Sequence, residues 1–369
     1  IGTGVFAVIE AGAQYNTALG SNALAALTTG DYNTIIGRIA GDAITTASLN
    51  DAFGYEALSS NTTGARNTAI GLNALKTLNH TDSTAGYNTA VGNNTGASMT
   101  TGINNTLIGG LAGDAITDAD ENTAVGHNAL TSETLGNQST AIGRGALTNQ
   151  NFTSAVNAIS TAVGFNAGGA VTTGVNNVLI GGYAGDALTG TADYSGGSNN
   201  VAVGRAALGA DTLGSSTVAI GFETLLAQNF TSTTESHNTA VGHRAGLAVT
   251  TGDQNTLIGA LAGDALTTGN KNVAVGKDAL NGGTTYDGNT AIGWEALKVA
   301  DNTSGSDGNN VAVGANCGAA VSSGIRNVLV GVSAGATLRT GGGNVLLGQG
   351  TDVSAAAAEN QITIGQSIA

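Results

Sequence analysis

Hydrophobic and polar positions recur along this chain with a short period, and the stretch Asn67-Thr68-Ala69-Ile70-Gly71 shows the pattern. Side chains alternate between the two faces of a β-strand, so Thr68 and Ile70 would share one face and Ala69 the other. Ala69 and Ile70 are adjacent and both apolar, which predicts a strand buried on both faces. One face can line the interior of a coil, and the other then needs a second cover.

The pattern restarts about twenty times. With Asn67 as position one, the restarts are Asn16, Asn33, Asn50, Asn67, Asn88, Asn105, Asn122, Ser139, Ser160, Asn177, Asn200, Thr217, Asn238, Asn255, Asn272, Asn289, Asn310, Asn327, Asn344 and Gln361. The interval is mostly 17 residues, and 21 recurs. Such a short period predicts an all-β parallel β-solenoid, in which each coil contacts only its neighbours. We expect one elongated domain over residues 1–369, a rod of about 95 Å with coils about 4.8 Å apart.

A second period lies on top of the first. A variant of the unit that carries Ala-Gly-Asp or a close relative begins at Asn33, Asn105, Asn177, Asn255 and Asn327. It returns every 72 residues, or 78 where the longest interval falls. Four coils therefore make a larger repeating unit.

Glycine marks the expected corners of each coil. It recurs at position five, as Gly71, Gly126, Gly242 and Gly276, and near position fifteen, as Gly30, Gly102, Gly174 and Gly252. Glycine adopts positive φ at no steric cost, so both places suit a turn. Between the corners we expect two extended legs. The first is Asn-Thr-Ala-Ile, and the second ends in an apolar residue followed by Thr-Thr-Gly, as at residues 249–252.

Asparagine at position one has a physical reason to recur. Identical amides stacked one coil above another can donate and accept hydrogen bonds along a column, as in cross-β ladders. The alternative is that asparagine only suits the turn before each strand. Ser139, Ser160 and Thr217 keep a hydrogen-bonding group at this position, which favours the column. Its predicted members include Asn67, Asn88, Asn105, Asn122, Asn238, Asn255, Asn272 and Asn289.

Composition narrows the classes of protein. Charged residues make up 10% of the chain, and proline, which would remove a ladder hydrogen bond from a stacked strand, is absent. The net charge is −14 and no cluster of Lys and Arg occurs, which argues against binding of nucleic acid.

No membrane-spanning segment is apparent, because no stretch approaches the ~20 apolar residues that a spanning helix needs. Ile1-Gly2 and Ile364-Gly365 both fall inside the repeat pattern. We therefore expect a fragment of a longer fibre, or a rod whose exposed strand edges stack end to end with partners.

The sequence predicts no enzyme, cofactor or metal site. Paired carboxylates, a Ser/His/Asp order, a phosphate loop and a CxxC pair are not apparent. Cys317 takes a position where other coils carry alanine, so we interpret it as a packing residue. Residues 109–116 and 181–188 resemble the calcium-binding nonapeptide of β-rolls in part, but Ala112 and Ala184 replace its glycines. Their Asp residues also recur only every fourth coil, whereas calcium sites form between consecutive nonapeptides.

Position six is the better candidate for recognition. Residues after the corner glycine should face outward, and they include Tyr55, Phe165, Phe222, Trp294, His127 and His243. Exposed aromatic residues can stack on sugar rings or meet a partner protein, and the alternative is that they are scattered on a large surface or touch a second protomer. Longer coils add loops at residues 77–87, 148–159, 189–199, 226–237 and 299–309, which are either recognition loops or spacers.

The repeat Asn-Thr-Ala-Ile/Val-Gly-x-x-Ala-Leu/Gly, as at residues 67–75, 122–130, 238–246 and 289–297, resembles two related groups. One is the head of YadA-type trimeric autotransporter adhesins, and the other is bacteriophage tail-fibre proteins with long Asn-Thr-Ala-Val-Gly arrays. The resemblance implies a left-handed β-roll and a homotrimer in a virion tail or at a cell surface. Sister chains would then cover the Ala69 and Leu257 face. The ending at residues 360–365 also looks like the exit of phage arrays that precede a self-cleaving chaperone domain.

These observations together predict a non-enzymatic trimeric fibre that presents loops to a host cell-surface glycan or protein. An alternative is an extracellular structural filament assembled end to end. Two further alternatives are an ice-binding solenoid and a polysaccharide-degrading β-helix. Against ice binding, Thr68 shares its face with Ile70, and valine replaces threonine at Val178, Val201 and Val273.

Overall fold

The computed structural model describes residues 3–4, 12–300 and 307–365. The predictions about the two chain ends and about residues 301–306 of the last long loop lie partly outside these residues. The chain divides into two compact units, Ile1–Asn177 and Val178–Ala369. Within the described residues both units consist of short strands and turns without any helix. The predicted all-β parallel solenoid of about 20 coils is confirmed.

Each main strand covers positions two to four of one coil. The first unit contains β1 (Thr17–Leu19), β2 (Thr34–Ile36), β3 (Asp51–Phe53), β4 (Thr68–Ile70), β5 (Thr89–Val91), β6 (Thr106–Ile108), β7 (Thr123–Val125), β8 (Gly136–Asn137), β9 (Thr140–Ile142), β10 (Val156–Asn157) and β11 (Thr161–Val163). The second contains β12 (Val178–Ile180), β13 (Val201–Val203), β14 (Gly214–Ser215), β15 (Val218–Ile220), β16 (Thr234–Glu235), β17 (Thr239–Val241), β18 (Thr256–Ile258), β19 (Val273–Val275), β20 (Thr290–Ile292), β21 (Val311–Val313), β22 (Val328–Val330), β23 (Val345–Leu347) and β24 (Ile362–Ile364).

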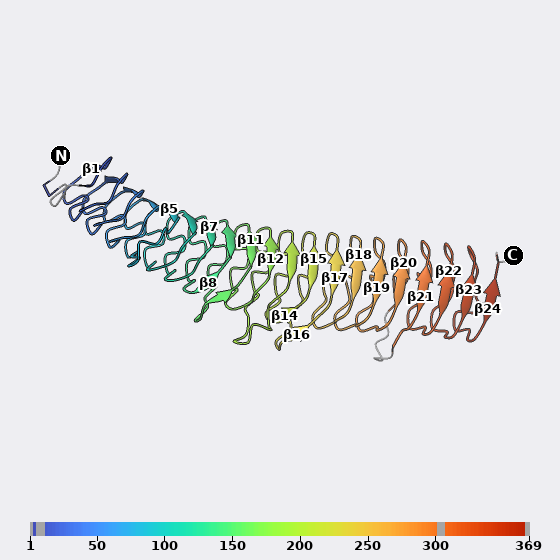
Figure 1. Cartoon of the computed structure of the whole chain (residues 1–369). Helices are drawn as coiled ribbons and strands as arrows, with labels where there is room; N and C mark the ends of the chain where they lie inside the picture. The colour runs from blue at the N-terminus through green and yellow to red at the C-terminus, as the bar shows by residue number, and fades with distance from the viewer. Residues whose placement is uncertain (1–2, 5–11, 301–306, 366–369) are drawn as a thin grey trace. The chain divides into compact units, whose positions relative to one another are not determined.

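The strands of each unit form a parallel ladder in which equivalent positions lie side by side (Figure 1). Ala69 pairs with Ala90, and Leu257 pairs with Ala274. The ladder of the first unit runs through β1 to β7, β9 and β11. The ladder of the second unit runs through β12, β13, β15 and β17 to β24. The register does not slip within either ladder, so each strand residue lies beside its counterpart in the next coil.

The Ala/Leu face of the ladder lines the interior of the coil. Ala69 and Leu257 are completely buried within a single chain, as are Ala74 and Leu75 on the facing turn. The prediction that sister chains cover the Ala69 and Leu257 face is therefore wrong. The face that points outward is the one that carries Thr68 and Ile70.

The position-five glycines have two reasons to be glycine. Gly71 has a φ of +133°, and a Cβ atom there would lie 2.2 Å from the carbonyl oxygen of Gly92 in the next coil. Gly126, Gly242 and Gly276 show the same conformation, with φ of +137°, +138° and +134°.

Near position fifteen, glycine is needed for a different reason than the positive φ that the sequence suggested. Gly102 and Gly252 do not have positive φ. A Cβ atom on Gly102 would instead lie 2.5 Å from the carbonyl oxygen of Ala119. Close approach of the next coil, and not a left-handed conformation, excludes side chains here.

A left-handed turn that the repeat pattern did not predict follows the main strands from β1 to β22. Positions seven and nine adopt positive φ even where they are not glycine, as at Asn73 (57°) and Leu75 (49°). The residue before position one does so as well, as at Arg66 (62°). Non-glycine residues are uncommon in this region, so the stacking of coils imposes the conformation against local preference.

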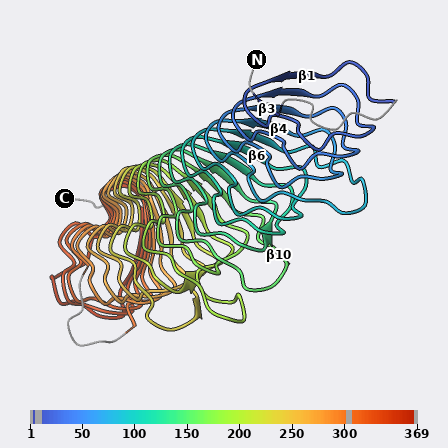
Figure 2. The same ribbon diagram turned by 90° about the vertical axis from the view of Figure 1, so that its left-hand side faces the viewer.

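The second leg is not the regular strand that the sequence suggested. Thr250 lies in a bend, and both its backbone N–H and its hydroxyl donate to the Thr267 carbonyl of the next coil, at 2.8 and 3.1 Å. Among the described residues, strands form on this side only as the short ladders β8–β10 and β14–β16. Longer loops accompany these ladders, and Figure 2 shows a loop beside β10 bulging from the outline of the first unit.

The position-one asparagines form a buried hydrogen-bonded column. The side-chain oxygen of Asn88 accepts from the backbone N–H of Asn105 at 3.0 Å, and the Asn105 side-chain amide donates across the coil to the Ala119 carbonyl at 2.8 Å. Side chains also bond along the column, as in Asn88 to Asn67 at 3.1 Å and Asn272 to Asn255 at 3.1 Å. The column satisfies polar backbone groups that the core would otherwise leave unpaired.

Where serine or threonine replaces asparagine in this column, a polar cluster occupies the core. The Gln150 amide donates to Ser139 Oγ at 2.8 Å and to the carboxylate of Glu133 at 3.0 Å. In the second unit Gln228 donates to Thr217 and Asp211 in the same way, at 3.1 and 2.7 Å. Burial raises the pKa of the Asp211 carboxyl, although its hydrogen bonds with Gln228 and the backbone oppose this shift.

Candidate functional site

The outer face of the strand ladder carries two rows of side chains, at positions two and four of each coil. In both units the position-four row is apolar. Seven of its isoleucines are 38–40% exposed, namely Ile70, Ile108, Ile142, Ile180, Ile220, Ile258 and Ile292. Valines such as Val91 and Val275 lie between them and are half-buried. An ordered apolar row on the surface of one chain indicates an interaction surface.

The position-two row distinguishes the two units. In the first unit it is threonine in every main strand except β3, which has Asp51. In the second unit it is mostly valine, at Val178, Val201, Val218, Val273, Val311, Val328 and Val345. The outer face of the second unit is therefore almost entirely aliphatic, whereas that of the first unit alternates hydroxyl and aliphatic rows.

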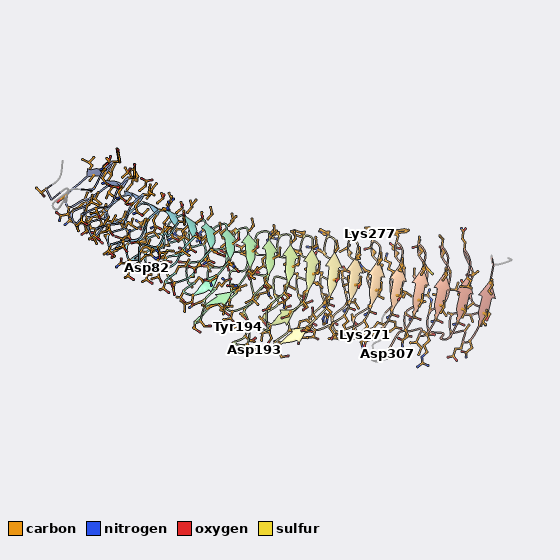
Figure 3. The ribbon with its side chains drawn as sticks, viewed as in Figure 1. Asp82, Asp193, Tyr194, Lys271, Lys277 and Asp307 are labelled. Carbon is orange, nitrogen blue, oxygen red and sulfur yellow. The ribbon has the colours of Figure 1, made fainter. Side chains whose placement is uncertain are left out.

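The residues at position six form a second surface, which we name the position-six column. In the second unit Figure 3 shows one member, Lys277, beside the tips of the strands. Lys271 lies at the opposite edge in the same view, on the side of Asp193 and Asp307. The predicted recognition residues Tyr55, Phe165, Phe222, Trp294, His127 and His243 all belong to this column.

Cations and rings stack on each other along the position-six column. The Arg38 guanidinium lies 5.4 Å from the centre of the Tyr55 ring, Arg144 lies 5.3 Å from Phe165, and Arg205 lies 5.6 Å from Phe222. The second face of Phe222 is covered by His243, whose ring is 5.5 Å away and nearly parallel. Neighbours in the column thus cover both faces of Phe222 and one face each of Tyr55 and Phe165, so these faces are not open to a ligand.

Trp294 differs from the other rings of the column. It is 49% exposed, and no ring or cation of the described part of the chain lies against its indole. The next coil places Ala315 at position six, and the coil after that places Val332 there. The alanine is too short to cover the indole, which leaves one face of Trp294 open.

A third column, which the repeat pattern did not predict, precedes position one. Tyr15 and Tyr32 stack with their ring centres 4.8 Å apart, and the Arg66 guanidinium lies 5.5 Å from the ring centre of Tyr87. All four residues have positive φ, a conformation that favours asparagine or glycine, as the chain has at Asn104 and Gly343. Tyrosine immediately before asparagine at three restarts was the signal in the sequence.

Of the long loops, residues 77–87 border a hollow in the first unit. It has a volume of about 290 Å³, and His80, Asp82, Asp118 and Asp120 are among the residues that line it. Burial lowers the pKa of His80, and the three carboxylates oppose this shift. The loop at 189–199 instead bonds within itself. Hydrogen bonds from Thr191 and Ser195 lower the pKa of Asp193 to about 2.

Within the described residues, no group of three or more His, Cys, Asp and Glu side chains could hold a metal ion. Cys317 is buried, and burial raises the pKa of its thiol to about 11, so the reactive thiolate is disfavoured. His127 and His243 lie in separate coils of different units.

Comparisons with known proteins add no assignment. No protein-family model matches the chain, and no curated protein sequence matches it. The resemblance to tail-fibre and YadA-type repeats therefore stays a prediction. In the part of the chain that is described, no helix has the length and apolar character needed to cross a bilayer.

Proposed function

We propose that this chain is the shaft of a non-enzymatic homotrimeric fibre, of the virion tail or an extracellular surface, that serves in attachment to host cells. The observation that supports the proposal is the apolar position-four row, which stays exposed when a single chain is considered alone. A face of this kind requires a cover, and a sister chain with an identical row supplies one of matching length. That three chains assemble, and not two, is inferred from the resemblance to tail-fibre and YadA-type repeats.

The size of the face supports an interface between chains. In the second unit eleven main strands lie at about 4.8 Å intervals, so a strip about 10 Å wide covers about 500 Å². The largest apolar patches on typical monomers cover about 300–600 Å². The strip of one unit alone is as large as the largest apolar patch of a typical monomer, and such patches often serve in binding.

Charge substitutions on the outer face test this proposal. Ile258→Glu with Ile292→Glu places two carboxylates in the position-four row, which should dissociate the trimer without disturbing the core, because both side chains point outward. Val299→Glu is the matched control, since Val299 is exposed but lies outside the face. Sedimentation velocity should show single chains for the double variant and trimers for the control. Equal sedimentation of all three proteins would contradict the proposed interface.

The threonine row of the first unit supports a second candidate, ice binding. Thr68, Thr89 and Thr106 point outward in one ladder at about 4.8 Å spacing, and an ice-binding face requires regular outward rows of threonine. The neighbouring Ile/Val row and Asp51 interrupt a purely threonine surface, so we rank this function second. Ice crystals that grow unchanged in the presence of the protein would dismiss it.

A further inference from the structure

Trp294 and Val332 stand on either side of Ala315 in the position-six column of the second unit. Their order is fixed by the backbone, because the N–H of Asn316 donates to the Trp294 carbonyl at 2.8 Å and the N–H of Ser333 donates to the Ala315 carbonyl at 2.9 Å. Trp294 is 49% exposed and Val332 is 46% exposed. We name this place, with its small residue between two large ones, the Ala315 step.

The equivalent place one larger repeat earlier is filled. Residues 72 positions before Trp294 and Ala315 are Phe222 and His243, and their rings stack at 5.5 Å. The residue equivalent to Lys277 is Arg205, which covers the other face of Phe222. Lys277 instead bonds to Asp278, so no described cation covers the indole. Lys277 in place of Arg205 and Ala315 in place of His243 therefore leave the Trp294 ring uncovered where the Phe222 ring is covered.

The space at the step suits one ring-shaped ligand. Two coil intervals separate the Trp294 and Val332 positions, which is about 9.6 Å. Carbon atoms in contact lie about 3.5–4.0 Å apart, so a ring with a neighbour on each face needs about 7–8 Å. A single saturated six-membered ring therefore fits between the two side chains, above the methyl group of Ala315.

Hydrogen-bonding groups follow each of these residues in the chain. Glu295, Asn316 and Ser333 occupy position seven of the same three coils. The side chains of Asn316 and Ser333 make no hydrogen bond with any described residue. Local charges balance, because Lys277 pairs with Asp278, and Lys298 pairs with Glu295 at 2.8 Å. Apolar walls beside two neutral polar side chains and one ion-paired carboxylate match an uncharged pyranose, which has apolar ring faces and a rim of hydroxyls.

We propose that the Ala315 step binds one neutral pyranose residue, with a face of the sugar on the Trp294 indole and its hydroxyls toward Asn316, Ser333 and Glu295. The inference deepens the attachment role proposed above and rests on it, because it gives that role a ligand class. An aromatic platform contributes most of such binding, and the hydrogen bonds select among stereoisomers.

Trp294 is the only tryptophan of the chain, so its fluorescence reports on the step directly. The protein is titrated with methyl glycosides of glucose, mannose and galactose and with N-acetylglucosamine, up to high millimolar concentrations. We expect a saturable change in emission with at least one of these sugars and a weaker response to its epimers. An emission spectrum that stays unchanged with all four would overturn the proposal.

Variants separate the step from the rest of the column. Ala315→His recreates the pair found at Phe222 and His243, keeps Trp294 as reporter and should weaken binding about tenfold or more. Phe222→Ala is the matched control and should bind as the unmodified protein does, because neighbours already cover both faces of that ring. Unchanged affinity of Ala315→His would refute the site. Ligand-observed saturation-transfer NMR gives the same comparison for Trp294→Ala, which should lose the signal.

Sedimentation of the same samples separates this inference from the proposed function. Trimers without a sugar-dependent emission change would refute the step and leave the fibre proposal intact. Single chains that bind the sugar would refute the trimer and leave the step intact. If emission shifts when the protein is diluted without sugar, a second copy of the chain occupies the step, and the proposal fails.

Discussion

Ala69 and Ile70 are neighbours in strand β4, yet Ala69 is completely buried and Ile70 is 39% exposed. The same contrast separates Leu257 from Ile258 in β18. The ladder therefore has an inner face that a single chain completes by itself, and an outer face that it leaves open. The proposed fibre assembles through that open face.

Two adjacent glycines should respond very differently to alanine. Gly109 has a φ of +129° and a Cβ there would lie 2.7 Å from Gly126, so Gly109→Ala should lower the free energy of unfolding by about 3 kcal/mol or more. Gly110 lacks positive φ, and a Cβ there meets nothing closer than 3.6 Å. Gly110→Ala should be neutral or raise stability by about 0.4–1 kcal/mol. Denaturant unfolding of both variants checks this, and equal losses would contradict the assigned conformations.

Removing one member of the asparagine column should be costly. Asn105→Ala leaves the buried N–H of Asn122 and the carbonyl of Ala119 without their partners, now bonded at 2.9 and 2.8 Å. Each unsatisfied buried group costs about 1–3 kcal/mol, so the loss should be about 2–5 kcal/mol. If asparagine only suited the turn, Asn105→Ala would cost well under about 1 kcal/mol in urea unfolding. Asn93→Ala, at an exposed asparagine without positive φ, is the control and should change stability little.

The position-one and position-five residues could be predicted because their types recur with the period of the coil. Which strand face lines the interior could not be read from alternation alone, since alternation separates Ala69 from Ile70 without saying which points inward. The asparagine column held the missing signal. Asn67 shares a face with Ala69, and a hydrogen-bonded column of amides is expected to be buried, which places Ala69 inside.

Other features depend on contacts between coils and have weak local signals. Leu75 and Leu58 have positive φ against their own preference, because the stacking of coils fixes the turn. The Thr-Thr-Gly leg resembles a strand in composition but bonds through bends. The candidate site was predicted only as a set of position-six residues. That Phe222 is covered and Trp294 is open became evident from the neighbours above and below each ring.

Asp211 should make stability depend on pH. Its folded pKa is raised by burial, so the folded chain holds the proton more tightly than the unfolded chain. The resulting stabilisation is present below the ordinary pKa of 3.8 and is lost as pH rises through the folded pKa. Asp211→Asn places at this position the residue that the first unit has at Asn61, and its stability relative to the unmodified protein should increase as pH rises above 3.8. Thermal melts at several pH values above 3.8 measure the difference.

Asp193 is a control for that experiment, because its pKa is shifted in the opposite direction. Its pKa is lowered to about 2, so its stabilising contribution is present above 3.8 and is lost as pH falls through about 2. The difference between Asp193→Asn and the unmodified protein should therefore shrink on acidification. If the Asp211→Asn difference does not change with pH, the carboxyl is not destabilised by burial.

Ile159 should be a site where stability can be gained. It is an exposed β-branched residue with a φ of 48°, directly before position one. Ile159→Asn should raise the free energy of unfolding by about 1 kcal/mol, because asparagine tolerates this conformation better. The reverse change at Asn104, which has a φ of 59°, should lower it by a similar amount. Paired urea titrations report both, and a loss at Ile159 would indicate that its side chain contacts a partner.

The molar mass of the unmodified chain in solution tests the central claim most directly. Native mass spectrometry or sedimentation equilibrium should give three times the chain mass of 35.8 kDa, because sister chains cover the outer faces in the proposed fibre. A stable particle of 35.8 kDa at micromolar concentration, with its position-four row in contact with water, would contradict the trimeric fibre.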